Sequence, residues 1–156
     1  MTPALADLLG RDKNRDKLIR SSLEVGAVLK MKLTKKEGIT PKNGNSRDKY
    51  FIIIGFDDSG NAIGVLLINS VINANLPDEI KLLHYPLKKD KYSFLSHNSH
   101  VDCSNIKPIS NDVFFERFAG DGSYGRIEEE DLELIIGAVK SSSTIEPKAL
   151  KKFGLV

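Results

Sequence analysis

Two apolar runs in the middle of the chain constrain its fold more than any other feature. Residues 50–56 (YFIIIGF) are rich in isoleucine and aromatic side chains and are too short for a buried helix, so they predict a core strand. The sequence DDSGN at 57–61 is typical of a turn, and residues 62–68 (AIGVLLI) predict the returning antiparallel strand. A β-hairpin is therefore the centre of the predicted fold.

Shorter strands are expected on either side of this hairpin. Residues 25–33 (VGAVLKMKL) alternate apolar and basic side chains toward their end, which predicts a strand with one wet, basic face. Further short strands are predicted over 71–75, 91–95, 100–103 and 106–109.

Helices are predicted toward both ends. Thr2-Pro3 is a helix start within an N-terminal extension, residues 1–20, and residues 77–83 predict one helical turn. Residues 127–139 give the clearest helical pattern, with apolar side chains at i, i+3, i+4 and i+7 (Leu132, Ile135, Ile136 and Val139). Ser143–Glu146 resembles a capping box that opens a last short helix.

These elements predict a mainly β fold of the α+β class. Strands this short and this close in sequence favour a small, SH3-like, mostly antiparallel β-barrel, with an N-terminal helix and C-terminal helices. With 156 residues, the chain is long enough for one domain over 21–156, preceded by the extension of residues 1–20. The regular strand–helix alternation of a doubly wound fold is absent from the pattern.

Composition narrows the classes of function. No apolar run approaches the roughly 20 residues that span a bilayer, so no membrane contact is expected. The lack of a signal pattern and the lone Cys103 are typical of a cytoplasmic protein. Net charge is only +2, yet residues 1–49 hold twelve Lys or Arg against six acids. That basic segment favours a polyanion such as RNA, and a solvated surface of mixed charge explains it equally well.

The common cofactor motifs are missing. There is no P-loop, GxGxxG, GxSxG or HExxH, and no cofactor is predicted. His97, His100 and Cys103 are ligand types at a tight spacing, but on a strand a spacing of three places them on alternating faces. We therefore predict no metal site, and the simplest role for Cys103 is that of a small buried apolar residue.

The polar cluster SHNSH at 96–100 is the strongest candidate for chemistry. Metal-free RNA cleavage needs a base for the 2′-hydroxyl, an acid for the leaving 5′-oxygen and cations for the phosphate. Histidine titrates near neutrality and suits the proton steps. His97 or His100, with Arg47, Lys49 and Lys107, supplies such a set if the fold brings them together. The alternative is an ordinary polar surface loop.

Five segments resemble the PemK/MazF-like family of toxin ribonucleases. Residues 26–33 are similar to the family's first strand, and 34–46 occupy the place of its mobile loop. Arg47–Ile54 resembles the element that joins an Arg to an apolar strand, with Arg47 or Lys49 as the cation. Leu66–Ser70 resembles the strand that ends in a hydroxyl residue, and Ser99–Ser110 resembles the later family motif.

The resemblance implies an endoribonuclease toxin that cuts single-stranded RNA without metal. Of the candidate catalytic residues, the resemblance implies Arg47, Ser70 and Lys107, whereas His97 and His100 are added from the chemistry of the polar cluster. A ribonuclease of this kind would hold the RNA backbone with lysines, and the candidates are Lys30, Lys32, Lys35, Lys36, Lys42 and Lys49. The family also implies a cognate antitoxin protein and a homodimer. The chain departs from the family at Lys107, which replaces an Arg, and at Ser110, which replaces an Asp and cannot transfer a proton as a carboxylate does.

Two other functions stay open at the level of sequence. The departures at Lys107 and Ser110 favour a non-catalytic SH3-like module that binds nucleic acid or protein. The apolar stripe of Leu5, Leu8 and Leu9 favours an assembly or scaffold protein that associates through its N-terminal extension.

Overall fold

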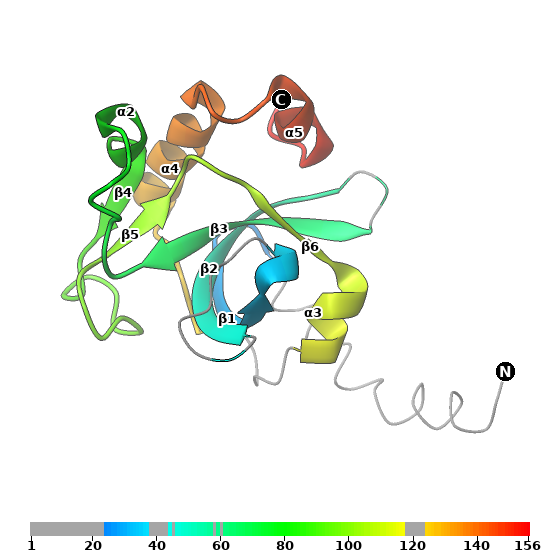
Figure 1. The fold of residues 1–156 in the computed structure, drawn as a ribbon, viewed down its shortest axis with the longest axis horizontal. Coiled ribbons are helices and arrows are strands. Elements are labelled where there is room, and N and C mark those ends of the chain that lie inside the picture. Colours follow the sequence, from blue (N-terminus) through cyan, green and yellow to red (C-terminus); the bar gives the residue numbers. More distant parts are fainter. Residues whose placement is uncertain (1–23, 38–43, 45, 58, 60, 118–123) are drawn as a thin grey trace, which may run out of the picture.

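The computed structural model describes residues 24–37, 44, 46–57, 59, 61–117 and 124–156 (Figure 1). The predicted N-terminal extension of residues 1–20 and the candidate Lys42 lie outside the described residues. Arg47 belongs to a described strand, but its side chain also lies outside what the structure describes.

The described residues form one seven-stranded antiparallel sheet with short helices. Its strand order is β4-β5-β3-β2-β1-β7, with β6 also paired to β3. The sheet curls into a half-barrel, so the predicted small SH3-like α+β fold is confirmed. In chain order the elements are β1 (Ala27–Thr34), η1 (Lys35–Glu37), β2 (Ser46–Phe56), β3 (Ala62–Asn69), α2 (Asp78–Lys81), β4 (His84–Leu87), β5 (Ser99–Asp102), β6 (Lys107–Ser110), α3 (Asn111–Arg117), β7 (Gly125–Arg126), α4 (Glu129–Ser141) and α5 (Pro147–Lys152).

The predicted central hairpin is β2 and β3. Ile52 pairs with Leu66 in its middle, and the chain reverses where Asp57 N donates to Ala62 O at 2.9 Å. The Asp57 carboxylate also accepts a hydrogen bond from Ser59 N at 3.1 Å, the side-chain-to-backbone contact that makes aspartate common in turns. β2 begins at Ser46, four residues earlier than the apolar run, because its polar start pairs with the end of β1.

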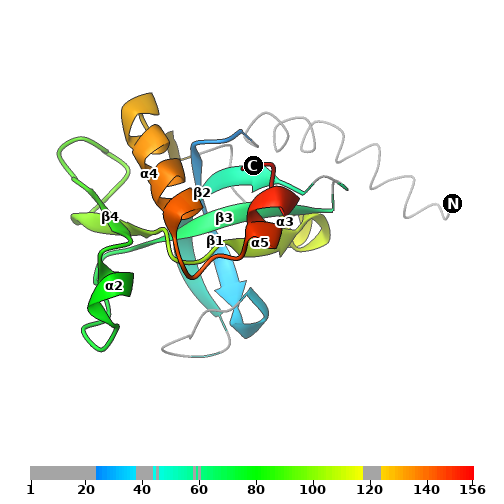
Figure 2. The same cartoon turned by 90° about the horizontal axis from the view of Figure 1, so that it is seen from above.

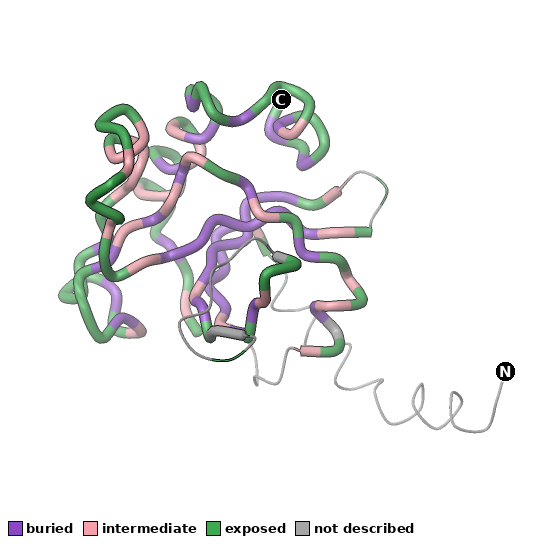
Figure 3. Tube along the Cα trace, in the orientation of Figure 1, coloured by how far each residue is buried: buried purple, intermediate pink, exposed green. Residues whose placement is uncertain are grey.

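Both faces of the hairpin are buried, which explains its nearly continuous apolar sequence. Alternate residues such as Ile52 and Leu66 face a core that α4 and α5 cover. The intervening residues, among them Phe51 and Leu67, face a second core that includes Phe114 of α3. Figure 1 shows α4 and α5 on one side of the sheet and α3 on the other, and Figure 2 shows α4 and α5 from above. Figure 3 shows the buried positions concentrated in the central strands.

Three predictions about elements are wrong. Residues 91–95 form no strand, because Tyr92 N and Leu95 N close successive turns onto Lys88 O and Tyr92 O. Residues 71–75 form no strand either, since Asn73 accepts the amide of Asn75 through its side chain, which is turn geometry. The capping box is not formed, because Glu146 is the N-cap of α5 and makes no side-chain cap bond.

Other predictions hold with shifted boundaries. α2 is the helical turn predicted within 77–83, β5 and β6 are the strands predicted near 100–103 and 106–109, and α4 is the helix predicted at 127–139. Ile135 and Val139 of α4 are fully buried, as its apolar stripe predicts. Strand β4 was not predicted, because it contains Pro86, which has no N–H to donate to a neighbouring strand. Proline is tolerated here because it lies exposed on the edge strand of the sheet.

Candidate functional site

The candidate site lies where one face of the sheet changes from apolar to charged. Ile52 on β2 is buried against the α4–α5 core. Toward the start of β2, Tyr50 stands opposite Lys30 of β1, and then Asp48 stands opposite Lys32. Directly opposed residues share a face of an antiparallel pair, so aromatic and charged groups extend the core face out to the end of the sheet.

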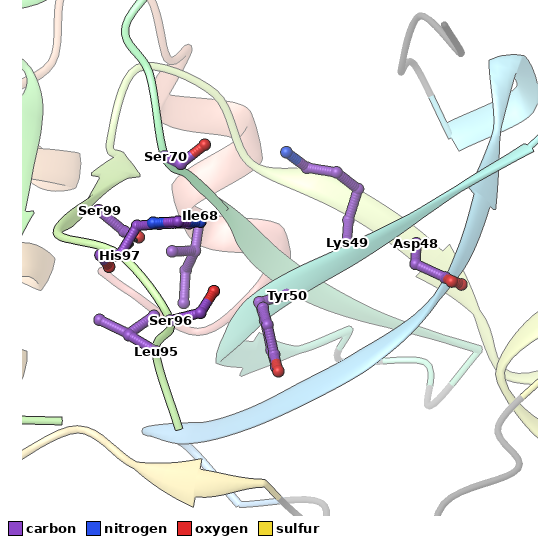
Figure 4. Close-up of a pocket in the computed structure, with 9 residues that line it drawn as sticks. All are labelled: Asp48, Lys49, Tyr50, Ile68, Ser70, Leu95, Ser96, His97 and Ser99. Atoms are coloured by element: carbon purple, nitrogen blue, oxygen red, sulfur yellow. Dashed lines mark hydrogen bonds between the residues drawn. The ribbon is translucent and has the colours of Figure 1, made fainter. Parts of the chain in front are cut away.

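A pocket of about 170 Å³ opens at this end (Figure 4). Three segments build it: the start of β2, the end of β3, and the loop that leads into β5. The lining residues are Asp48, Lys49, Tyr50, Ile68, Ser70, Leu95, Ser96, His97 and Ser99. Pockets for whole organic ligands measure roughly 300 Å³ or more, so this one fits a single group of a larger molecule that crosses the surface.

Hydrogen bonds within the loop fix the position of His97. Ser99 Oγ donates to the His97 carbonyl oxygen at 2.9 Å, and Lys89 N donates to the Asn98 side chain at 2.9 Å. Leu95 anchors the start of the loop in the core, while His97 itself is exposed. The imidazole is therefore presented to solvent at the pocket from a backbone that is tied down on both sides.

Lys49 contributes to the pocket from the opposite face of β2. Its side chain is only 7% exposed, and its Nζ donates to Asn69 Oδ1. Figure 4 shows Lys49 and Tyr50 projecting to opposite sides of the strand, with Ser70 and His97 across the pocket from both. Lys49, a predicted RNA-binding residue, is thus a buried cation that places positive charge beneath the pocket.

His100 does not join His97. It pairs with Asn69 of β3 and Pro86 of β4, on the same face as Lys49, and it is not among the residues that line the pocket. Burial, and after it the charges of His84 and Lys88, lower the pKa of His100. Its Nδ1 is buried and has no hydrogen-bond partner among the described residues. His97 is therefore the one histidine of the described pocket, and a paired-histidine site is not assembled.

Lys107 and Ser110 also lie away from the pocket. Lys107 pairs with Val65, four residues along β3 from Asn69, or about 13 Å at the usual rise of a strand. Ser110 precedes α3, and its Oγ accepts the amide of Val113 at 3.2 Å, the geometry of a helix N-cap. The serine at the family's Asp position thus has a local structural role.

The remaining described lysines extend a basic track from the pocket along β1 into η1. Lys30 is half-buried, with Nζ 5.1 Å from the Tyr50 ring centroid, whereas Lys32, Lys35 and Lys36 are exposed. Lys35 and Lys36 line a second cavity, of about 350 Å³, with Thr34 and Arg117. Arg117 Nη1 donates to Lys32 O at 3.4 Å, which keeps this arginine beside the track.

Sequence reasoning missed several residues of the site. The sequence predicts Tyr50 only as the start of a core strand and indicates no separate role for Asp48 or Asn69. Period-two alternation carries the missing signal, because it places Asp48 and Tyr50 on one face and Lys49 on the other. Pairing Lys49 with Asn69 also needs the register of the hairpin, which residue patterns alone do not specify.

Cys103 is fully buried, as expected, and burial raises the pKa of its thiol to about 12. No group of three or more potential metal ligands occurs in the described part of the chain. Among its helices, none is long and apolar enough to cross a membrane.

No protein-family model matches this chain, and no curated protein matches it. The placement of the residues therefore carries the functional argument.

Proposed function

We propose that this protein is a metal-independent endoribonuclease of the toxin type, and that it cuts single-stranded RNA at the pocket of β2, β3 and residues 95–99. One observation carries the proposal: three segments that are distant in sequence bring Lys49, Ser70 and His97 to one small pocket at the end of a basic track. The similarity of the same strands to the PemK/MazF-like family supports it.

The reaction is an attack of the RNA 2′-oxygen on the adjacent phosphorus. A new bond from phosphorus to the 2′-oxygen forms, and the bond to the 5′-oxygen breaks. His97 accepts the 2′-hydroxyl proton, and the resulting imidazolium delivers that proton to the departing 5′-oxygen. The products are a 2′,3′-cyclic phosphate and a 5′-hydroxyl, so atoms and protons balance without a co-reactant.

Other groups at the pocket act on the phosphate. The exposed Ser70 hydroxyl donates to a non-bridging oxygen of the phosphate. The Lys49 ammonium lies beneath the pocket and stabilises the negative charge that builds up on the non-bridging oxygens. Arg47 lies two residues before Lys49 on β2, and its catalytic role stays the prediction made from sequence. The exposed lysines of the track hold the flanking phosphates, which makes binding dependent on salt.

The test is incubation of the purified full-length protein with a mixed-sequence single-stranded RNA in EDTA, with end-group analysis of the products. Wild type is expected to leave 2′,3′-cyclic phosphates. His97→Gln is expected to cut at least about 100-fold more slowly, the usual contribution of a proton-transfer group. Ser70→Ala should cut roughly tenfold more slowly, the loss of one hydrogen bond to a charged group. Ser143→Ala, at an exposed serine far along the chain, is the matched control.

The histidine variants also test where the site is. Loss of cleavage in His100→Gln together with full cleavage in His97→Gln overturns the assignment to this pocket. Thermal unfolding of each variant, measured in parallel, separates a catalytic loss from a folding defect.

A second function follows from the single histidine of the pocket. If wild type binds the RNA and yields no product, the site is a binding module for single-stranded nucleic acid, as the positions of His100 and Lys107 favour. If it neither binds nor cuts RNA, both functions are overturned.

The proposed toxin activity implies two partners. An antitoxin protein would cover the pocket and the basic track, and a second copy of the chain would complete a homodimer. Light scattering of the protein alone, and protection of RNA on addition of the antitoxin, test these two partners separately.

A further inference from the structure

An exposed tyrosine stands beside the pocket. Tyr124 is 50% exposed, and its ring meets that of Tyr50 edge-on, at a centroid distance of 5.7 Å and an interplanar angle of 86°. Tyr50 in turn packs at 6.0 Å against Phe94 and lines the pocket with His97. The three rings form a continuous aromatic surface from the core to solvent, with Tyr124 as its outer member.

The backbone holds Tyr124 in this position. Its amide donates to Val28 O at 2.8 Å, and the next residue, Gly125, pairs with Val28 between β7 and β1. A Cβ added at Gly125 would lie 2.4 Å from the Phe94 ring, so only glycine lets that ring pack against the strand here. The tyrosine is therefore pre-positioned, which lowers the ordering cost when a ligand stacks on it.

Positive charge lies directly alongside. Lys30 Nζ is 5.1 Å from the centroid of Tyr50, and Lys32 follows on the same face of β1 with its side chain exposed. An aromatic face next to lysines matches a ligand that alternates flat rings with negative charges. Single-stranded nucleic acid has this chemistry, whereas the bases of a duplex are stacked on one another and are unavailable.

We propose that Tyr124, supported by Tyr50, is a stacking subsite for one unpaired nucleobase of single-stranded RNA, and that Lys30 holds the phosphate beside it. The subsite deepens the proposed function, since Tyr50 connects it to the pocket where the scissile phosphate would sit. The subsite therefore requires that the base next to the cleaved phosphodiester bond is unstacked.

The first experiment measures binding independently of cleavage. A fluorescein-labelled single-stranded 2′-O-methyl RNA is titrated with full-length protein by anisotropy, because its blocked 2′-oxygen cannot attack. Tyr124→Leu should bind about tenfold more weakly, the typical loss for one base–aromatic stack, while Tyr124→Phe stays within about twofold of wild type. Phe56→Leu, at an exposed aromatic residue near the other end of β2, is the matched control and should bind like wild type.

The second experiment locates the base. A single abasic position is moved along the same oligonucleotide, and at one position it should weaken wild-type binding about tenfold. At that position it should have no further effect on Tyr124→Leu, because the two changes remove the same contact.

The outcomes separate the subsite from the nuclease. Tyr124-dependent binding of the blocked RNA, with no cleavage of ordinary RNA, retains the subsite and overturns the nuclease. Cleavage with equal affinities for wild type and Tyr124→Leu overturns the subsite alone. The subsite is also overturned if Tyr124→Leu loses as much affinity for duplex RNA as for single-stranded RNA, or if the protein binds no RNA at all.

Discussion

One carboxylate fastens the start of α4 to β4 and to the turn that follows β4. Asp131 accepts a hydrogen bond from Tyr85 Oη at 2.6 Å and another from Tyr92 Oη, and Lys91 Nζ lies 2.9 Å from its Oδ2. Tyr92 also accepts the backbone amide of Glu128 at 3.2 Å. Asp131 thus ties the start of α4 to β4 through Tyr85, and to the turn that follows β4 through Lys91 and Tyr92.

We predict that Asp131→Asn destabilises the protein by about 2 kcal/mol at neutral pH, the usual loss when hydrogen bonds to a charged group are weakened. Asparagine keeps one acceptor oxygen and loses the charge that attracts Lys91. Urea unfolding measures the change, with Glu130→Gln, at the exposed neighbour on α4, as the control. Equal stabilities of the two variants would contradict the role given to Asp131.

The same cluster predicts how stability varies with pH. Burial acts to raise the pKa of Asp131, but hydrogen bonds from Tyr85, Tyr92 and Lys91 outweigh it, so the folded pKa lies below the ordinary 3.8. Its contribution is present above pH 3.8 and is lost as pH falls through the folded pKa. Burial, and then the bond to Asp131, raise the pKa of both tyrosines to about 12. Their contribution is complete below pH 10 and is lost as pH rises toward 12.

The sequence predicts which residues are candidates for the site, but not which of them come together. Ser70 and His97 meet at the pocket because Ser70 follows β3, His97 precedes β5, and these two strands pair at that end of the sheet. His100 is separated from His97 because Ser99 begins β5, and from there alternate residues face opposite sides. The conformation of the loop before Ser99 therefore decides where His97 points. That conformation depends on contacts such as the hydrogen bond from Lys89 to Asn98, which no local sequence pattern predicts.

Ser110 is the cap that begins helix α3. We predict that Ser110→Ala costs about 1 kcal/mol of stability, the usual effect of losing an N-cap, with no effect on RNA cleavage. Ser143→Ala should change stability by less than about 0.5 kcal/mol, because α5 begins after Glu146 and the expected capping box does not form. Urea unfolding of both variants is the measurement. If Ser143→Ala lost more stability than Ser110→Ala, the result would indicate that the capping box at Ser143 forms and that the cap at Ser110 does not.

The two elements with the clearest signal in the sequence are those with extended, regular burial. The hairpin of β2 and β3 is buried on both faces and reads as two apolar runs, and α4 buries one stripe at helical spacing. The prediction of a strand at residues 91–95 is wrong because Tyr92 and Leu95 are buried although they lie in turns and not in a hydrogen-bonded strand. β4 has only four residues and contains Pro86, so tertiary pairing with β5 overrides its local preference.

The C-terminal segment closes the core against the central hairpin. Phe153 follows α5, is 4% exposed, and lies over two glycines, Gly55 of β2 and Gly64 of β3. Figure 2 shows α5 lying over these strands. A Cβ at Gly64 would lie 2.8 Å from Cγ of the Phe153 ring, and one at Gly55 would lie 2.2 Å from the Phe153 carbonyl oxygen. Phe153 therefore packs on β2 and β3 only where these strands carry glycine and have no side chain.

This arrangement predicts two different couplings with Phe153→Ala, which alone should cost about 3–5 kcal/mol. Gly64→Ala should cost about 1–3 kcal/mol in wild type and much less in Phe153→Ala, because removing the ring makes room for the new methyl group. The cost of Gly55→Ala should persist in Phe153→Ala, since the carbonyl oxygen that it meets belongs to the backbone. Urea unfolding of both double-mutant cycles measures these couplings. Additive costs at Gly64, or relief of the cost at Gly55, would show that the C-terminus does not seat on the hairpin through these contacts.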